Sequence, residues 1–295
     1  MSIFTGAGVA IITPFNDDDT VNYEEFGRII DDQIANSTDA IIVCGTTGES
    51  STMPDEEHVS VIKYCVDKVA GRVPVIAGTG SNCTREAVNM SKKAEEVGAD
   101  GLLCVTPYYN KCTQDGLYEY YKAISDAVNI PIIMYNVPSR TGTTIQPETA
   151  VRIAKEVKNV VAIKEASGNI TQMDDIIKNK PENFNVISGD DGITFPLITL
   201  GAVGVISVIG NAFPREFSRM TRLALQGDFA NALTIHHRFT ELFNLLFVDG
   251  NPAGVKSMLN AMGMIENKLR LPLVPTRITT FEAIRKVLNE LNIKC

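Results

Sequence analysis

Short apolar runs recur along the first two-thirds of the chain and alternate with longer stretches of mixed polarity. Each run is about five residues long, rich in β-branched side chains and apolar throughout. The runs lie at 8–13, 39–45, 73–78, 100–107, 130–136, 160–166, 185–189 and 202–207. Strands that are buried on both faces of a parallel sheet have this appearance, so the pattern predicts eight parallel strands.

The stretches between the runs have a helical period. The apolar positions are Phe26, Ile29, Ile30 and Ile34 in residues 22–36, and Val59, Ile62, Val66 and Val69 in residues 55–69. Apolar residues spaced three and four apart form one face of a helix that packs on a sheet. Eight strands that are each followed by a helix predict an α/β fold, a (β/α)8 TIM barrel of about 210 residues.

The last part of the chain lacks strand-like runs. An apolar stripe runs through residues 228–247, and residues 251–263 and the segment after Pro275 also predict helices. We therefore expect two domains, a catalytic (β/α)8 barrel in residues 1–225 and a C-terminal helical extension in residues 226–295. Since no flexible linker separates them, we expect the helices to pack on the barrel or on another subunit.

Composition and charge narrow the range of partners. Hydrophobic residues make up 44% of the 295 residues, and 27 Lys and Arg against 35 Asp and Glu give a net charge of −8. Because an acidic chain binds nucleic acid and anionic membranes poorly, we expect neither as a partner. No apolar run approaches the roughly 18–20 residues of a membrane span, and the N-terminal segment lacks the features of a signal peptide. We therefore expect a cytoplasmic protein.

Cysteine and histidine spacing predicts neither disulfides nor a metal site. The six cysteines form no C-x-x-C pair, and several lie in apolar runs, so we expect reduced thiols. The three histidines lack metal-ligand spacing, and His236 shares a helix face with Ala232 and Phe239, which favours packing in the core. The segment AGTGSNC at 77–83 has Cys83 where a dinucleotide-binding turn needs its third glycine. We expect no metal and no cofactor.

A TIM barrel has its active site at the carboxyl ends of its strands, so polar residues there are candidates. Lys164 ends the sixth run and should point into the barrel mouth, where a neutral amine can form a Schiff base with a carbonyl group. The alternative is a lysine that pairs with Glu165 or extends outward. Residues 185–214 contain no Lys or Arg, which disfavours a phosphorylated substrate.

Other residues at strand ends have plausible chemistry and plausible structural roles. Tyr135 can relay protons through its phenol or cap the barrel interior. Thr46 and Thr47 lie between glycines, where backbone N–H groups can approach a carboxylate or form a tight turn. Arg140 offers a two-pronged contact to a carboxylate, with a surface ion pair as the alternative.

Five motifs at these strand ends carry a resemblance to a known family. GTTGES, TPYYN, YNVPSRTG, IKEASGN and SGDD occur in the order and spacing of the dihydrodipicolinate synthase family. The similarity runs over essentially the whole chain and includes NPAGVKS near residue 251. That family belongs to the pyruvate-dependent class I aldolases, which have a (β/α)8 barrel and a helical C-terminal domain.

The resemblance implies an activity and roles for individual residues. The family condenses pyruvate with L-aspartate 4-semialdehyde through a lysine Schiff base, which gives 4-hydroxy-tetrahydrodipicolinate in lysine and diaminopimelate biosynthesis. Lys164 would form the imine, and Tyr135 would donate and accept protons. Thr46 and Tyr135 would complete a proton relay with Tyr109 from another subunit. The substrate-binding residues implied by the resemblance are Thr47, Arg140, Gly189 and Ile206.

Two alternatives remain beside this interpretation. N-acetylneuraminate lyase and keto-deoxy-sugar-acid aldolases use the same lysine on another aldehyde. The sugar-acid lyase typically lacks an arginine equivalent to Arg140, so the arginine favours aspartate semialdehyde. A non-catalytic relative would be expected to lack Lys164 or Tyr135, and both are present.

The resemblance also implies an allosteric cleft and an assembly. In the family, lysine inhibits by binding at the tight dimer interface. The equivalent positions are Ser50, Ser51, Asp55, His58, Asn82, Glu86 and Tyr108. Because Asp55 replaces the histidine of strongly sensitive members, we expect weak or absent inhibition. The shared role of Tyr109 implies a homo-oligomer, and the family's usual form is a homotetramer built from two dimers.

Overall fold

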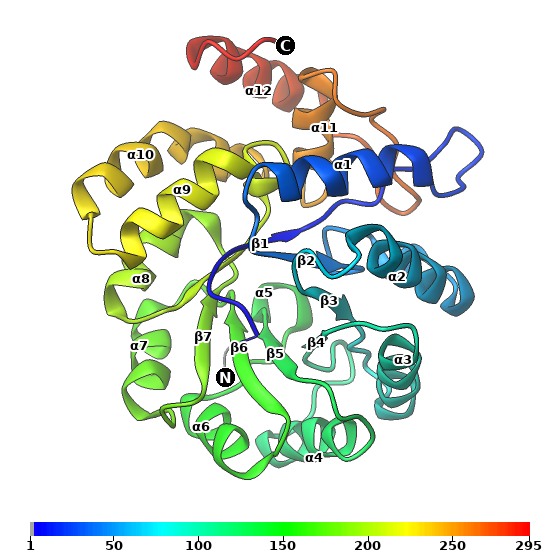
Figure 1. The fold of residues 1–295 in the computed structure, drawn as a ribbon, viewed down its shortest axis with the longest axis vertical. Helices are drawn as coiled ribbons and strands as arrows, with labels where there is room; N and C mark the ends of the chain where they lie inside the picture. The colour runs from blue at the N-terminus through cyan, green and yellow to red at the C-terminus, as the bar shows by residue number, and fades with distance from the viewer. Residues whose placement is uncertain (1–2) are drawn as a thin grey trace.

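Eight parallel strands close into a barrel in the order in which they occur along the chain (Figure 1). The computed structural model describes residues 3–295, so the first two residues of the N-terminal segment lie outside it. The strands are β1 Gly6–Ala10, β2 Ala40–Val43, β3 Val75–Gly78, β4 Gly101–Val105, β5 Ile132–Asn136, β6 Val160–Glu165, β7 Asn185–Ser188 and β8 Gly204–Ser207. Pairing of β8 with β1, which places Ile206 opposite Gly8, completes the ring. The predicted (β/α)8 barrel is confirmed.

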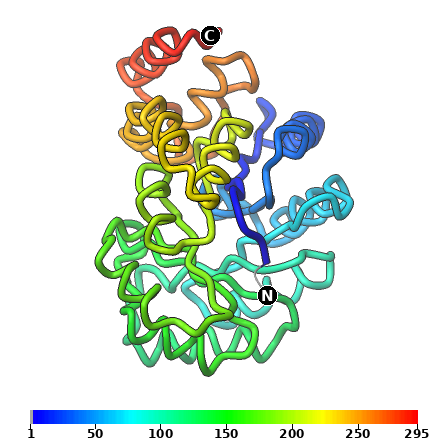
Figure 2. Tube along the Cα trace, turned by 60° about the vertical axis from the view of Figure 1, so that its left-hand side comes forward, coloured from blue at the N-terminus to red at the C-terminus, as the bar shows by residue number. Residues whose placement is uncertain are grey.

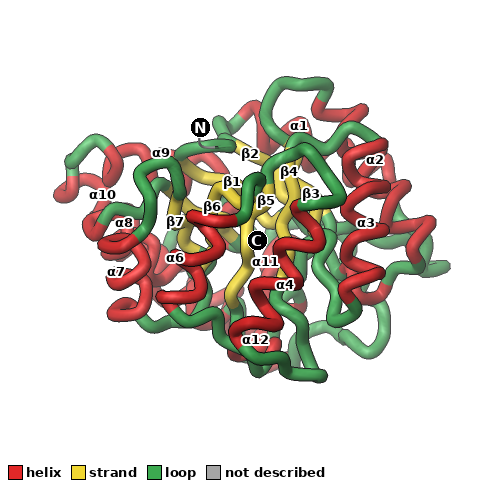
Figure 3. The backbone as a smooth tube through the Cα atoms, turned by 90° about the horizontal axis from the view of Figure 1, so that it is seen from below, coloured by secondary structure: helices red, strands yellow, loops and turns green. Residues whose placement is uncertain are grey.

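Helices surround the strands on the outside of the barrel, as the view from below shows (Figure 3). They are α1 Tyr23–Ala35, α2 Asp55–Val69, α3 Thr84–Glu96, α4 Gln114–Ser125, α5 Pro138–Thr141, α6 Pro147–Glu156, α7 Ile170–Asn179, α8 Thr194–Leu200 and α9 Pro214–Leu225. Short 3-10 turns are η1 Ser50–Thr52, η2 Asp191–Ile193 and η3 Ile209–Asn211. Several helices begin where a side chain caps their free N–H groups. The Asn22 side chain, for example, accepts from the Glu25 N–H at the start of α1.

The first strand differs from its predicted range. The apolar run at 8–13 predicts a strand there, whereas β1 spans Gly6–Ala10 and the chain then leaves the sheet. The Ile12 N–H donates to Asn211 Oδ1 at 3.0 Å, and the Thr13 hydroxyl donates to the Gly48 carbonyl at 2.8 Å. These buried residues hydrogen-bond to loops and turns instead of a neighbouring strand, so apolarity indicated their burial but not their conformation.

Alternate residues of each strand fill the barrel interior. On β6, Ala162 packs inside with Ile133 and Ile187, whereas Ile163 belongs to the layer between the strands and the helices. Successive strand residues point to opposite faces, so Lys164 lies on the same inner side as Ala162. The strand pattern thus aims Lys164 at the barrel axis.

Three further helices follow the barrel, α10 Phe229–Leu245, α11 Ala253–Ala261 and α12 Ile278–Glu290. They gather at one side of the barrel, and α12 lies at the outer edge of this group (Figures 1 and 2). The Phe213 and Phe239 rings are 4.8 Å apart and join α10 to the segment before α9. These helices therefore pack on the barrel, while the division of the chain at residue 225 stays a prediction.

Neither a membrane span nor a metal-binding cluster is found in the described part of the chain. Within residues 3–295, no helix combines the length and apolarity needed to cross a membrane. The same residues contain no cluster of three or more His, Cys, Asp or Glu side chains that could hold a metal ion. All six cysteines are free, and burial raises the pKa of the Cys104 thiol to about 11.

Candidate active site

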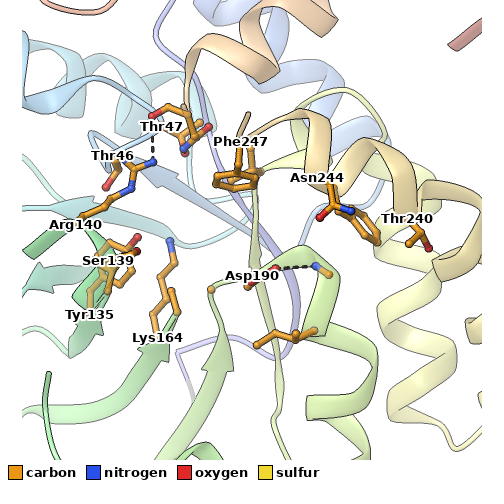
Figure 4. Close-up of a pocket in the computed structure, with 18 of the residues that line it drawn as sticks. Thr46, Thr47, Tyr135, Ser139, Arg140, Lys164, Asp190, Thr240, Asn244 and Phe247 are labelled. Carbon is orange, nitrogen blue, oxygen red and sulfur yellow. Dashed lines mark hydrogen bonds between the residues drawn. The ribbon is translucent and has the colours of Figure 1, made fainter. Parts of the chain in front are cut away.

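A cavity of about 730 Å³ opens where the carboxyl ends of the strands face α10 (Figure 4). Six of the sequence-predicted residues line it, namely Thr46, Thr47, Tyr135, Arg140, Lys164 and Gly189. They come from the ends of β2, β5, β6 and β7 or from the loops that follow them. The barrel therefore collects in one place residues that are more than 140 positions apart in the sequence.

Lys164 is the central group of this cavity. Its side chain is 5% exposed, and its Nζ lies 4.3 Å from the centre of the Tyr135 ring. Strand register explains the contact, because Lys164 on β6 is paired with Tyr135 on β5. Among the described residues no carboxylate forms an ion pair with this lysine. A buried amine without a counter-ion is suited to attack a carbonyl group.

Glu165 is held away from the cavity on the outer face of β6. It accepts hydrogen bonds from Asn136 Nδ2 at 2.9 Å, the Ser167 N–H at 2.8 Å and Gln172 Nε2 at 3.2 Å. Burial raises the pKa of Glu165, and these hydrogen bonds oppose the rise. The alternative in which Lys164 pairs with Glu165 is therefore wrong, because neighbouring strand residues face opposite ways.

Gly189 leaves room for the lysine. Its N–H donates to the Glu165 carbonyl at 2.8 Å, which brings the loop after β7 against the end of β6. A Cβ atom at this position would lie 2.8 Å from the Ala166 Cβ and 3.0 Å from the Lys164 Cε. A side chain here would press against both Ala166 and Lys164, so the glycine leaves room for the lysine in its observed position.

The turn at residues 45–49, which we call the glycine turn, presents Thr46 and Thr47. The Gly48 N–H donates to the Gly45 carbonyl at 3.1 Å, and the Glu49 N–H donates to the Thr46 carbonyl at 3.2 Å. Thr47 is buried, and its hydroxyl accepts from Asn251 Nδ2 at 2.9 Å. The turn is thus both tight, as the structural alternative proposed, and part of the cavity wall.

Arg140 lies at the mouth of the cavity on the short helix α5. Its Nη2 donates to the Asn251 carbonyl at 3.2 Å, and it forms no ion pair among the described residues. Within residues 3–295, Arg140 therefore does not form the surface ion pair that was the alternative to substrate binding. An exposed guanidinium with free donors can receive a carboxylate from solvent.

Asn251 links these two residues and was not assigned a role from the sequence. Its side chain is 6% exposed, its Nδ2 holds Thr47 and its backbone holds Arg140. Its Oδ1 is buried without a hydrogen-bond partner within residues 3–295, and Asn251 lines the cavity. The NPAGVKS motif that begins at this residue was the available signal.

Two predicted residues do not line the cavity. Ile206 on β8 is 1% exposed and packs in the barrel interior with Tyr135 and Ile187. Tyr109 is 91% exposed and has a φ of 71°, in the left-handed region that tyrosine rarely adopts. The structure of one chain therefore brings Thr46 and Tyr135 together but leaves Tyr109 on the outside.

One wall of the cavity comes from α10 and the loop that follows it, and sequence reasoning missed it as part of the site. Its members are His236, Thr240, Phe243, Asn244 and Phe247 (Figure 4). His236 was predicted to pack in the core, and its ring does lie 5.8 Å from Phe195 and 5.4 Å from Phe243. Burial lowers its pKa, which favours a neutral ring facing the cavity. The apolar stripe of α10 gave no signal of this second role.

A buried carboxylate organises the loops after β7 and β8. Asp191 Oδ2 accepts from the Ile209 N–H at 2.8 Å and from the Val208 N–H at 3.0 Å. Burial raises the pKa of Asp191 to about 6, although these hydrogen bonds lower it. Since Val208 lines the cavity, Asp191 fixes part of its wall from behind.

A second cavity of about 360 Å³ adjoins the first. It collects Ser50, Ser51, Asp55, His58, Glu86 and Tyr108 from the predicted allosteric set. Asn82 does not line it, and its carbonyl accepts from Asn110 Nδ2 at 2.9 Å. Thr46 and Arg140 line both cavities, so a ligand in the second would lie close to groups of the first. Burial lowers the pKa of His58, whose Nε2 lies 2.9 Å from the Gly78 carbonyl oxygen.

Known proteins resemble this chain over nearly its whole length. The 4-hydroxy-tetrahydrodipicolinate synthase of Phocaeicola vulgatus is 66% identical over 290 residues, 98% of each chain. That of Parabacteroides distasonis is 64% identical over 290 residues, again 98% of each.

Solved structures give the same result. Dihydrodipicolinate synthase from Aquifex aeolicus is 48% identical with a TM-score of 0.96, covering 98% of this chain and 99% of that one. The enzyme from Cyanidioschyzon merolae with lysine bound is 37% identical with a TM-score of 0.96, covering 99% and 100%. A model of the dihydrodipicolinate synthetase family matches residues 3–291. This chain therefore belongs to the dihydrodipicolinate synthetase family.

Proposed function

We propose that the protein is a Schiff-base-forming lyase that condenses pyruvate with L-aspartate 4-semialdehyde to give 4-hydroxy-tetrahydrodipicolinate. The observation that carries this proposal is Lys164, a buried amine that faces a cavity and has no carboxylate partner among the described residues. Membership of the family supplies the two substrates. The reaction is a step of lysine and diaminopimelate biosynthesis. We propose that the protein acts in the cytoplasm.

The chemistry follows from the properties of an imine. The Lys164 amine adds to the keto carbon of pyruvate, and water leaves to form the protonated imine. This cation draws electrons and makes the pyruvate methyl group acidic, so loss of a proton gives an enamine. The enamine carbon bonds to the aldehyde carbon, whose oxygen takes up a proton. The amino group of the second substrate then attacks the imine carbon, closing the ring and releasing Lys164.

Tyr135 is placed to move the protons in these steps. Its ring lies beside Lys164, and its side chain belongs to the same cavity (Figure 4). A phenol can donate a proton to the leaving oxygen and later remove one from carbon. In our proposal Thr46 and Tyr109 complete the relay, with Tyr109 contributed by another subunit.

Substrate binding is divided between two ends of the cavity. In our proposal Thr47, which lines the cavity, holds the pyruvate carboxylate, and Gly189 leaves room for Lys164 beside it. The role of the Ile206 backbone stays a prediction, because Ile206 is buried and does not line the cavity. Arg140 receives the carboxylate of the aldehyde at the mouth, where its guanidinium has free donors. No additional cofactor is needed, because the imine itself accepts the electrons.

The assembly we propose is a homotetramer of two dimers. The exposed, left-handed Tyr109 supports it, since a bulky side chain in that conformation is expected where a contact holds it. One of the similar solved structures is described as a monomeric dihydrodipicolinate synthase variant, so assembly requires a direct measurement. The solution mass by light scattering decides between one, two and four chains.

We also propose that lysine inhibits weakly or not at all. Asp55 stands in the second cavity with its carboxylate 3.6 Å from Lys93 Nζ, an ion pair largely exposed to solvent. Inhibition by micromolar lysine would contradict this proposal.

The aldehyde specificity is tested by a coupled assay with purified protein. We expect rapid turnover of pyruvate with aspartate semialdehyde and little with sugar aldehydes. The opposite preference would identify a sugar-acid aldolase instead, while leaving the Schiff-base chemistry intact.

A further inference from the structure

A buried ion pair lies behind the glycine turn and outside the cavity lining. Glu49 Oε1 and Lys256 Nζ are 2.5 Å apart, and both side chains have 0% exposure. Glu49 ends the glycine turn, whereas Lys256 lies on α11. Moving two charges out of water costs more free energy than their attraction often returns, so such a pair is weak evidence for a role in stability. Its place in the fold suggests another role.

Backbone groups complete the surroundings of both charges. Lys256 Nζ also donates to the Lys268 carbonyl at 2.8 Å, and Glu49 Oε2 accepts from the Arg270 N–H at 3.2 Å. The Phe15 ring lies against two cations, with Lys256 Nζ 4.4 Å and the Arg270 guanidinium carbon 4.3 Å from its centre. The pair therefore joins the glycine turn to two segments of the C-terminal part.

The turn has a backbone conformation that needs such support. Glu49 has a φ of 57°, in the left-handed region that a residue with a Cβ atom adopts at a cost. Thr47 lies two residues earlier in the same turn. A change in the conformation of Glu49 would therefore move the Thr47 hydroxyl.

The same C-terminal segment holds the turn at a second point. Asn251 lies two residues before the start of α11, and its Nδ2 donates to the Thr47 hydroxyl at 2.9 Å. At Gly254 a Cβ atom would lie 2.1 Å from the Leu246 carbonyl oxygen, so α11 is packed closely against the end of α10. The position of α11 thus determines where both Asn251 and Lys256 meet the turn.

We propose that Glu49 and Lys256 are positioning residues, whose buried ion pair fixes the glycine turn so that Thr47 and the turn backbone can hold the pyruvate carboxylate. This inference rests on the proposed function, because it takes pyruvate as the ligand of the turn. Lys164 lies on β6 and Tyr135 on β5, and neither forms a described contact with Glu49 or Lys256. Loss of the pair therefore weakens pyruvate binding more than it slows the later chemistry.

The test compares Glu49→Gln and Lys256→Met with the wild type as full-length proteins. The steady-state KM for pyruvate, kcat, the thermal midpoint and the pyruvate dependence of borohydride trapping are measured. We expect the pyruvate KM to rise about tenfold or more, since small misplacements in a binding site have effects of this size. We expect kcat to change by less than about threefold, because the chemical groups keep their places.

A matched control separates positioning from simple stability. Arg222→Met breaks the ion pair between Arg222 Nη2 and Asp39 Oδ1 (2.7 Å), at the opposite end of the barrel from the cavity. Because this pair is partly exposed, the change should lower the thermal midpoint slightly and leave the pyruvate KM unchanged. In the double variant Glu49→Gln/Lys256→Met no lone charge remains buried, so the midpoint should recover in part while the pyruvate KM stays high.

Two results would overturn the inference. One is a pyruvate KM within twofold of wild type in both single variants despite a lowered midpoint. The other is recovery of both the midpoint and the KM in the double variant. If the single variants do not fold, Glu49→Asp decides by the same KM criterion, because it keeps the charge and shortens the side chain. Absence of trapping in the wild type would instead overturn the proposed function, and this inference with it.

Discussion

Lys164 Nζ lies 4.3 Å from the centre of the Tyr135 ring, and the two residues are partners in the register of β5 and β6. The contact is therefore built into the sheet and does not depend on a loop. It places a phenol beside the amine that would form the imine. The effects of changes around this pair follow from the same geometry.

Gly189→Ala should displace Lys164. The added methyl group would lie 3.0 Å from the Lys164 Cε and 2.8 Å from the Ala166 Cβ, closer than carbon atoms normally approach. We expect the rate of borohydride trapping with pyruvate to fall about a hundredfold, as a misplacement of about 1 Å can cause. Gly71→Ala is the control. It strains the backbone, because Gly71 has a φ of 71°, but no described atom lies within 4 Å of the added Cβ. Equal trapping rates in the two variants would contradict the steric role of Gly189.

Arg140→Met should weaken the binding of aspartate semialdehyde and leave the binding of pyruvate unchanged. The change removes the guanidinium that would receive the aldehyde carboxylate, and the Asn251 backbone remains in place. We expect the KM for aspartate semialdehyde to rise about 10- to 100-fold, the usual effect of losing a charged contact of about 1.5–3 kcal/mol. Trapping with pyruvate alone should keep its concentration dependence. A comparable loss in pyruvate trapping would show that Arg140 serves the first substrate instead.

Tyr109 should act across a subunit interface. Tyr109→Phe removes the hydroxyl from the proposed relay, and we expect kcat to fall about 100-fold, a typical contribution of general acid–base catalysis. Mixed oligomers of Tyr109→Phe and Lys164→Met chains should recover activity, because one of their sites combines an intact Lys164 with an intact Tyr109. Activity that stays at the level of the unmixed variants would place Tyr109 in its own chain's site or outside catalysis.

Asp191 should make stability depend on pH. Its pKa is about 6 in the folded protein against 3.8 for an ordinary aspartate, so between these values the folded state binds more protons than the unfolded state. Stability from this residue is complete below pH 3.8 and is lost as the pH rises to about 6. This shift corresponds to a loss of roughly 3 kcal/mol.

Denaturant unfolding of wild type and Asp191→Asn at pH 4.5 and pH 7 measures this effect. The amide can still accept from the Val208 and Ile209 N–H groups but does not ionise. The free energy of unfolding should therefore decrease more between the two pH values in the wild type than in the variant. Equal decreases would show that the buried carboxyl is not responsible.

Sequence patterns were sufficient to predict the eight strands and to place Lys164 at the end of one of them, whereas its catalytic role stays a proposal. Buried parallel strands leave continuous apolar runs, and a lysine at the end of such a run has one direction in which to point. The end of β1 was misplaced because Ile12 is buried without belonging to a strand. Apolarity reports burial, and conformation follows from it only where neighbours are also known.

Sequence patterns could not predict which residues of the C-terminal helices contact the site. Asn251 meets Thr47 across 204 positions of sequence, and Lys256 meets Glu49 across a similar separation. A polar residue on a helix gives no periodic signal of what it contacts. The wall formed by α10 was read from its apolar stripe as core, since Thr240 and Asn244 are ordinary helix residues until the cavity is seen.

Borohydride reduction in the presence of pyruvate tests the central role of Lys164 most directly. We expect one covalent adduct per chain, with the mass of a reduced pyruvate imine, located on Lys164 by peptide mass spectrometry and absent from Lys164→Met. The same adduct should not form when pyruvate or borohydride is omitted. No adduct in the wild type, or an adduct on another lysine, would contradict the proposed mechanism.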